Sequence, residues 1–132
     1  MIVTYRSRPD GAAETVARIE ALGGSAVAVP LDVGDVASFA PFAERLREEL
    51  AARWGRSSFD HLVDNAGVGG PRDVRRDHRG ALRGVHRVLF KGPFFLTQTL
   101  LPLLADDGAI VFTSSNSALH TAVEPAYAAY AT

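Results

Sequence analysis

The sequence contains no cysteine among its 132 residues. Without thiols the chain forms neither a disulfide nor a thiolate metal site, which suits a reducing cytoplasm. It also lacks an excess of charge of either sign, since the formal net charge is -1. A chain so close to neutral has no overall field that would draw it to nucleic acid or to an anionic membrane.

Long apolar runs are missing as well. The most apolar region, "VLFKGPFFLTQTLLPLLA", is interrupted by Lys91, Gln98 and two prolines, so buried core is a better interpretation than a membrane span. The opening "MIVTYRSRPDG" has no apolar stretch of signal-peptide length, and we find no repeat or linker-like run. The 47% of apolar residues and 22% of charged residues are typical of one globular domain with a real core.

Helix-like and strand-like patterns alternate along the chain. Two amphipathic helices are predicted, one in "RPDGAAETVARIEALGG" and one from Asp35, as N-cap, to Trp54. The apolar stripe of the second helix consists of Val36, Phe39, Ala43, Leu46 and Leu50. A third helical region ends in "FFLTQTLLPLL", and four strands are predicted in "IVTY", "SAVAVPLDV", "FDHLVDNAG" and "GAIVFTSS".

Helical crossovers of this length make neighbouring strands run parallel, which predicts an open α/β sheet. Ligands of such sheets bind outside the carboxyl ends of the strands. The segments "YRS", "LDV", "NAG" and "TSSNS" lie at those ends, so the functional site is expected there.

Taken in order, "VTYRS", "LDV", "DHLVDNAG", "KGPFFLTQTLLPLL" and "GAIVFTSS…PAYAAYAT" resemble the short-chain dehydrogenase/reductase family. The 3-ketoacyl-carrier-protein-reductase-like branch is the most similar in character. The resemblance implies an α/β fold with a doubly wound, mostly parallel, Rossmann-like sheet that binds NAD(P). Residues 1–132 would be a partial domain of this kind, looking like an internal fragment that lacks the first strand and the C-terminal strands.

The resemblance also implies which residues hold the cofactor. Arg6 follows the first visible strand, where a guanidinium can pair with a 2′-phosphate, so NADP(H) is favoured over NAD(H). A solvated loop arginine is the alternative. Asp32 and Val33 correspond to the pair that holds adenine, although a short aspartate can instead cap the next turn. Asn65, Ala66 and Gly67 resemble the "NNAG" motif near the ribose, with Asp64 in place of the usual first asparagine.

For catalysis, the resemblance assigns Tyr130 as the proton donor to the substrate carbonyl. Tyr127 does not serve, because Ala131 stands where the family has its lysine; for Tyr130 that lysine would lie beyond Thr132. The serine that bonds the carbonyl is Ser115 by strand register, or Ser117 by its thirteen-residue spacing to Tyr130, and Ser115 is preferred because strand register is more constrained than loop length. These serines are equally suited to capping the strand end.

Several features depart from the family pattern. The glycine-rich pyrophosphate-binding turn is not seen, and Leu89 occupies the place of an asparagine that completes a proton relay in many members. The segment "PRDVRRDHRGALRGVHRV" is basic, and Gly80 and Gly84 weaken helix there, so we expect it to be solvated and irregular rather than a nucleic-acid site. The four histidines, His61, His78, His86 and His120, show no metal-ligand spacing, so no metal site is expected.

The leading hypothesis is therefore an oxidoreductase that transfers hydride between NADP(H) and a small ketone or alcohol. The alternatives are a catalytically inactive remnant and a nucleotide-sensing or interaction module on the same fold. We expect a cytoplasmic protein with no nucleic-acid or membrane partner, and a possible homo-oligomer in the full-length parent. Because the missing first strand would lie between the strands of "IVTY" and "HLVDNAG", the isolated chain is expected to expose unpaired edges and to aggregate or rearrange.

Overall fold

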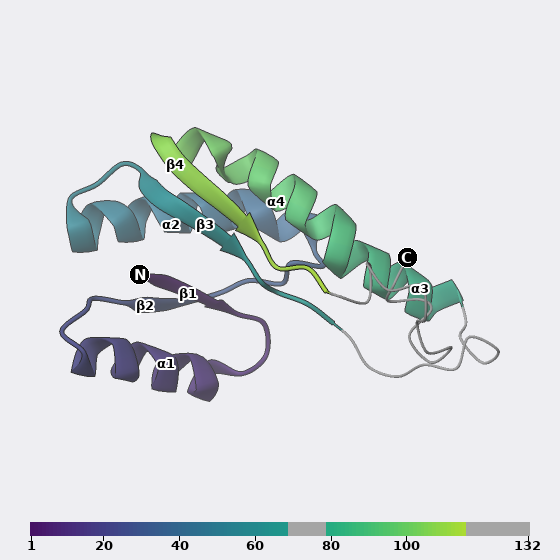
Figure 1. The fold of residues 1–132 in the computed structure, drawn as a ribbon, viewed down its shortest axis with the longest axis horizontal. Helices are drawn as coiled ribbons and strands as arrows, with labels where there is room; N and C mark the ends of the chain where they lie inside the picture. Colours follow the sequence, from purple (N-terminus) through teal and green to yellow (C-terminus); the bar gives the residue numbers. More distant parts are fainter. Residues whose placement is uncertain (69–78, 116–132) are drawn as a thin grey trace.

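The computed structural model describes residues 1–68 and 79–115 of the chain. Strands and helices alternate in it, as the sequence predicts (Figure 1). The first half comprises β1 (Ile2–Tyr5), α1 (Pro9–Ala21), β2 (Val27–Pro30), the 3-10 turn η1 (Val36–Ser38), α2 (Phe39–Trp54) and β3 (Phe59–Asp64). The second half comprises α3 (Arg79–His86), the π-helical turn η2 (Arg87–Lys91), α4 (Gly92–Leu100), the 3-10 turn η3 (Leu101–Leu103) and β4 (Leu104–Phe112).

The strands pair in two parallel sheets. In one, β1 pairs with β2 from Ile2↔Val27 to Tyr5↔Pro30, and in the other β3 pairs with β4, with Asp64 opposite Phe112. Among the described residues no ladder joins the two sheets, so both the parallel pairing and the expected interruption between β1 and β3 are confirmed. All four strands point the same way in Figure 1, which places their carboxyl ends on one side of the molecule.

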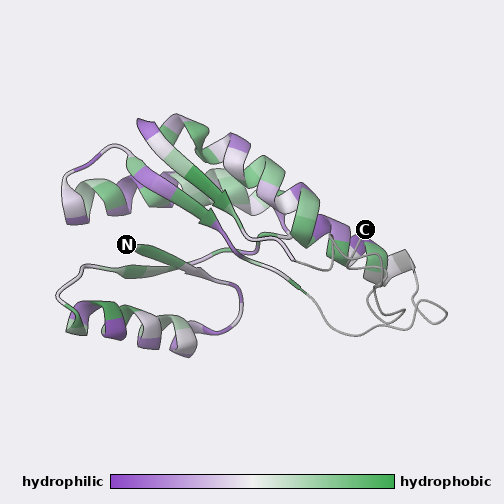
Figure 2. Ribbon diagram, in the orientation of Figure 1, coloured by the Kyte–Doolittle hydropathy of each residue, from purple (hydrophilic) through white to green (hydrophobic). Residues whose placement is uncertain are grey.

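One apolar core holds the two sheets together. Helix α2 presents one buried stripe to the strands, and α4 packs beside it; Ile2 and Leu62, one from each sheet, are half-buried against this core. Figure 2 shows apolar residues along the strands that meet these helices. The core consists of Val29, Leu31, Val33, Phe39, Phe42, Ala43, Leu46, Leu50, Leu96, Leu100 and Leu103. The predicted stripe of α2 is thus confirmed, with Val36 at its half-buried edge.

The helix boundaries follow local signals in the sequence. The Asp35 side chain accepts a hydrogen bond from the backbone N–H of Ala37 at 3.2 Å, which confirms it as an N-cap, although of η1 rather than of α2 directly. Helix α2 ends at Gly55, whose φ of 62° lies in the left-handed region that glycine adopts without strain.

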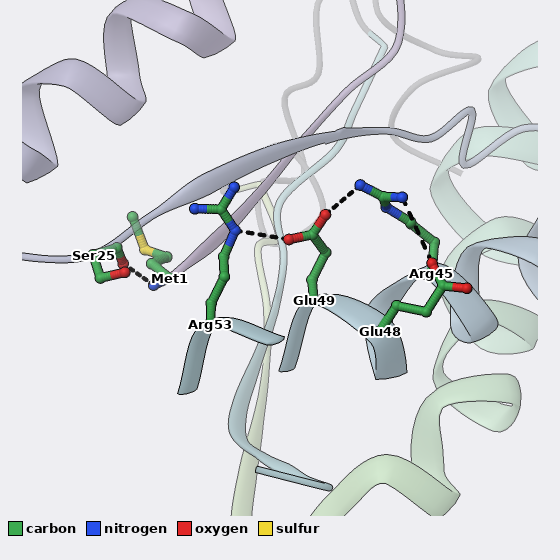
Figure 3. Close-up of polar contacts among 6 residues, drawn as sticks. All are labelled: Met1, Ser25, Arg45, Glu48, Glu49 and Arg53. Carbon is green, nitrogen blue, oxygen red and sulfur yellow. Dashed lines mark hydrogen bonds and ion pairs between the residues drawn. The ribbon is translucent and has the colours of Figure 1, made fainter. Parts of the chain in front are cut away.

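A charged cluster on α2 borders the core. Glu49 is 6% exposed and accepts hydrogen bonds from Arg45 and, at 2.7 Å, from Arg53 (Figure 3). The hydrogen bond from Arg53 is the largest cause that lowers the pKa of Glu49 below its ordinary value. The Glu49 carboxylate is paired with two partly exposed arginine side chains. At this edge of the α2 core, ion pairs rather than apolar contacts shield the buried residue from water.

One expectation about the basic segment is wrong within the described residues. Residues 79–86 form α3 despite Gly80 and Gly84, whereas residues 71–78 lie outside the described part. The helix continues into η2, and Val85 and Val88 are buried on its inner side. Tertiary packing of these valines outweighs the weak helix propensity of the two glycines.

Candidate functional site

The carboxyl ends of β1 and β2 carry the first predicted cofactor residues. Arg6 is exposed directly after β1, and Asp32 and Val33 follow β2. The Asp32 carboxylate accepts a hydrogen bond from the backbone N–H of Gly34 at 2.8 Å, while Val33 is buried in the core. The Asp32 side chain therefore caps this turn, and the bond fixes the direction of its carboxylate.

The ends of β3 and β4 are joined by two hydrogen bonds. The backbone N–H of Thr113 donates to the carbonyl oxygen of Asp64, and its hydroxyl donates to the Asn65 side-chain oxygen, both at 2.9 Å. Asn65 and the half-buried Ser115 are thus held on neighbouring strand ends. Sequence reasoning missed Thr113, since only strand register brings it opposite the Asn65 turn.

Asp64 has an unusual environment for a carboxylate. It is 7% exposed, and its Oδ2 atom has no hydrogen-bond partner within residues 1–68 and 79–115. Burial raises the pKa of Asp64 above its ordinary value, because removal from water disfavours the charged form. The sequence showed Asp64 only as a departure from "NNAG"; its burial depends on the fold.

Leu89 lies beside the Asn65–Ala66–Gly67 turn. A Cβ atom placed on Gly67 would lie 3.5 Å from Cδ2 of Leu89. Leu89 belongs to η2, and π-helical turns of this kind are frequent at functional sites because they re-aim side chains. This edge of the site therefore presents an apolar side chain where the resemblance implies an asparagine.

Gly92 lets α4 approach the end of β2. A Cβ atom on Gly92 would lie 2.1 Å from the backbone oxygen of Val33, so only glycine fits there. No local pattern in the sequence predicts that Gly92 touches Val33. The contact brings η2 and α4 against the loop that carries Asp32.

Some of the remaining predicted site residues belong to the described part of the chain, and the others lie outside it. Ala66 and Gly67 are exposed after Asn65, beyond the carboxyl end of β3, on the side of the molecule where β1 and β2 also end. Tyr130, Tyr127 and Ser117 lie outside the described residues. Within residues 1–68 and 79–115 no group of three histidine or acidic side chains is placed to hold a metal ion. No helix in that same part is long and apolar enough to cross a membrane.

A family model for the short chain dehydrogenases matches residues 1–132. The chain belongs to this family. A short-chain dehydrogenase/reductase of Pestalotiopsis microspora is 31% identical over 130 residues, covering 98% of this chain and 46% of that protein. Versicolorin reductase 1 of Aspergillus parasiticus is 31% identical over 136 residues, covering 98% of this chain and 47% of that protein.

Solved structures of the family agree with the fold. The crystal structure of landomycin C-6 ketoreductase LanV with bound NADP and rabelomycin has a TM-score of 0.90 and 31% identity. The match covers 98% of this chain and 52% of LanV. The chain thus spans about half the length of the relatives it matches, and the incomplete Rossmann-like α/β fold expected from the sequence is confirmed.

Proposed function

We propose that this short-chain dehydrogenase chain is part of a reductase that transfers hydride between NADP(H) and a ketone or alcohol substrate. Residues 1–132 would form part of one nucleotide-binding domain. The observation that carries the proposal is the pair of hydrogen bonds by which Thr113 fastens β4 to Asp64 and Asn65. They hold the Asn65 turn and Ser115 together at the strand edge where α/β sheets bind their ligands.

The cofactor roles follow from the chemistry of the residues at that edge. Arg6 is exposed and makes no ion pair with a described residue, so its guanidinium is available for a 2′-phosphate. Asp32, oriented by the Gly34 N–H, offers its carboxylate to the adenine amino group beside Val33. Asn65, Ala66 and Gly67 present small side chains and backbone toward the ribose. The NADP bound in LanV supports the preference for NADP(H).

The catalytic roles rest on Ser115 and Tyr130. Bound NADPH would supply the hydride to the carbonyl carbon. The Tyr130 hydroxyl would donate the proton that the carbonyl oxygen takes up, and the Ser115 hydroxyl would hold that oxygen by a hydrogen bond. The names of the similar proteins, a ketoreductase and a versicolorin reductase, support a carbonyl substrate.

Nucleotide binding tests the cofactor part of the proposal. Titration with NADP+ and NAD+ should show tighter binding of NADP+, and Arg6→Glu should weaken NADP+ binding at least about ten-fold, the loss expected for a charge-assisted phosphate contact. Binding of NAD+ should change little. Arg8→Glu is the matched control, because Arg8 is exposed in the same loop. Equal loss for both nucleotides would contradict the assignment of Arg6.

Turnover tests the catalytic part. With the protein at its full length, NADPH oxidation in the presence of a ketone should be abolished by Tyr130→Phe and retained by Tyr127→Phe. Nucleotide binding without oxidation in the unsubstituted protein would favour the sensing module instead. Absence of both binding and oxidation would favour the inactive remnant.

A further inference from the structure

Three side chains from two distant segments meet beside Gly34, in the loop after β2. A Cβ atom placed on Gly34 would lie 3.1 Å from Oδ1 of Asp32 and 3.2 Å from Nε of Arg87. It would also lie 3.2 Å from Cγ2 of the buried Val88. Because position 34 carries no side chain, the guanidinium of Arg87 comes close to the carboxylate of Asp32 at the edge assigned to the cofactor.

The backbone of Arg87 is fixed relative to the loop that carries Asp32. The carbonyl oxygen of Arg87 accepts a hydrogen bond from the backbone N–H of Gly92, which closes the π-helical turn η2. Gly92 in turn packs against the backbone oxygen of Val33, the neighbour of Asp32 in the chain. The starting point of the Arg87 side chain is therefore set by the same contact that joins α4 to this loop.

Both charged groups keep hydrogen-bonding capacity for a ligand. Oδ1 of Asp32 accepts the N–H of Gly34 at 2.8 Å, and Oδ2 accepts no hydrogen bond within residues 1–68 and 79–115. Arg87 forms no ion pair with any residue of that same part, Asp32 included. A carboxylate acceptor and guanidinium donors thus lie next to each other without being paired.

We propose that Arg87 is a specificity-determining residue that reads the adenine base of the cofactor together with Asp32. Adenine presents a donor, its N6 amino group, beside an acceptor, N7. Oδ2 of Asp32 would accept from the amino group, and the guanidinium of Arg87 would donate to N7. The inference rests on the proposed function, since it adds a residue to the adenine part of that site.

A phosphate group of the cofactor fits this position less well than the base. The carboxylate of Asp32 would repel the negative charge of a phosphate beside Arg87, whereas it attracts an amino group. The methyl group of Val88 adds apolar surface between the two charged groups. Apolar surface with a few placed polar groups is typical of a site for a flat ring such as a purine.

The test measures the affinity of the full-length protein for three nucleotides by isothermal titration calorimetry. They are NADP+, NAD+ and the NADP+ analogue that has hypoxanthine in place of adenine. Arg87→Met should weaken NADP+ and NAD+ by the same factor, at least about five-fold, because both carry adenine. The hypoxanthine analogue should lose more, since a guanidinium bonds both O6 and N7 of a 6-oxo purine but only N7 of adenine.

Two further variants locate the effect at the base. Asp32→Asn should shift the preference toward the hypoxanthine analogue, because an amide can donate to O6 where a carboxylate repels it. Arg83→Met is the matched control, since it removes the same charge one helical turn earlier, from an exposed residue that is not among the groups around Gly34. It should leave all three affinities unchanged.

The outcomes that overturn the inference are distinct from a failure of the proposed function. A loss of NADP+ affinity without a loss for NAD+ would place Arg87 at the phosphate instead of the base. Equal losses for the adenine and hypoxanthine forms would indicate a general effect of charge, and unchanged binding by Arg87→Met would show no contact; each of these overturns the inference alone. If the unsubstituted protein bound none of the nucleotides, the proposed function would fail and the inference with it.

Discussion

The Thr113 hydroxyl donates a hydrogen bond to the side-chain oxygen of Asn65, which lies 48 residues earlier in the chain. The bond connects the end of β4, near the proposed catalytic Ser115, to the turn assigned to the ribose. It fixes the orientation of the Asn65 amide, whose nitrogen is then left to donate elsewhere. The bond therefore joins the proposed catalytic side of the site to its proposed cofactor side.

Replacing Thr113 should loosen the Asn65 turn. Thr113→Val keeps the shape of the side chain but removes the hydroxyl donor, a loss of about 1 kcal/mol or about five-fold in affinity for NADP+. Thr113→Ser retains the donor and should bind NADP+ like the unsubstituted protein. Isothermal titration calorimetry measures both. Equal affinity of the valine and serine variants would show that the bond does not position Asn65.

Asp64 should make folding less favourable as the pH rises. Its pKa in the folded state is raised by burial, so the folded chain holds the proton more tightly than the unfolded chain. Its contribution to stability is present below the ordinary aspartate pKa and is lost as pH rises through the raised value. Asp64→Asn does not titrate and should be more stable at neutral pH by on the order of 1 kcal/mol, since burying the charged form of a carboxylate is costly.

The measurement is the free energy of unfolding from urea titrations at several pH values. The free energy of unfolding of the unsubstituted chain, minus that of Asp64→Asn, should become more negative from acid to neutral pH. Glu49→Gln provides a control of opposite sign, because the pKa of Glu49 is lowered and its contribution is lost as pH falls through that lowered value. A pH-independent difference for Asp64→Asn would contradict the prediction.

Replacement by alanine should change the stability in opposite directions at Gly84 in α3 and at Gly92, the first residue of α4. Gly92→Ala places a methyl group 2.1 Å from the Val33 oxygen, a backbone clash expected to cost more than about 2 kcal/mol. The methyl group of Gly84→Ala meets no atom of the described residues within 4 Å and should stabilise α3 by about 0.5–1 kcal/mol. Thermal unfolding followed by circular dichroism distinguishes them. Similar effects of the two substitutions would mean that Gly92 does not set the approach of α4 to the loop after β2.

The uncovered face of the β3–β4 sheet should promote aggregation of the 132-residue chain. Val63 and Val111 are paired across the ladder and are 61% and 50% exposed. Replacing both with threonine keeps β propensity and removes apolar surface, so light scattering on heating should decrease. The same change at Leu62 and Ile110, which are half-buried on the alternate face, should instead lower the midpoint of unfolding. Unchanged scattering of the Val63 and Val111 variant would locate the aggregating surface elsewhere.

Much of the fold could be predicted because its signals are local. The apolar stripe of α2, the Asp35 cap and the β-rich runs each lie within a few residues, and helix or strand geometry acts over that same range. The parallel pairing followed from the crossover lengths. The order of the motifs identified the family and predicted the edge of the sheet where the candidate site lies.

Only the tertiary structure decided which side chains meet at that edge. The burial of Asp64, the bond between Thr113 and Asn65, and the contact of Gly92 with Val33 join residues far apart in the chain. The helical state of Gly84 likewise depends on the packing of Val85 and Val88, against its own propensity. The sequence by itself determined the elements and their order, because these follow from short-range backbone preferences and apolar periodicity. The environment of each site residue came from long-range packing, which no local pattern encodes.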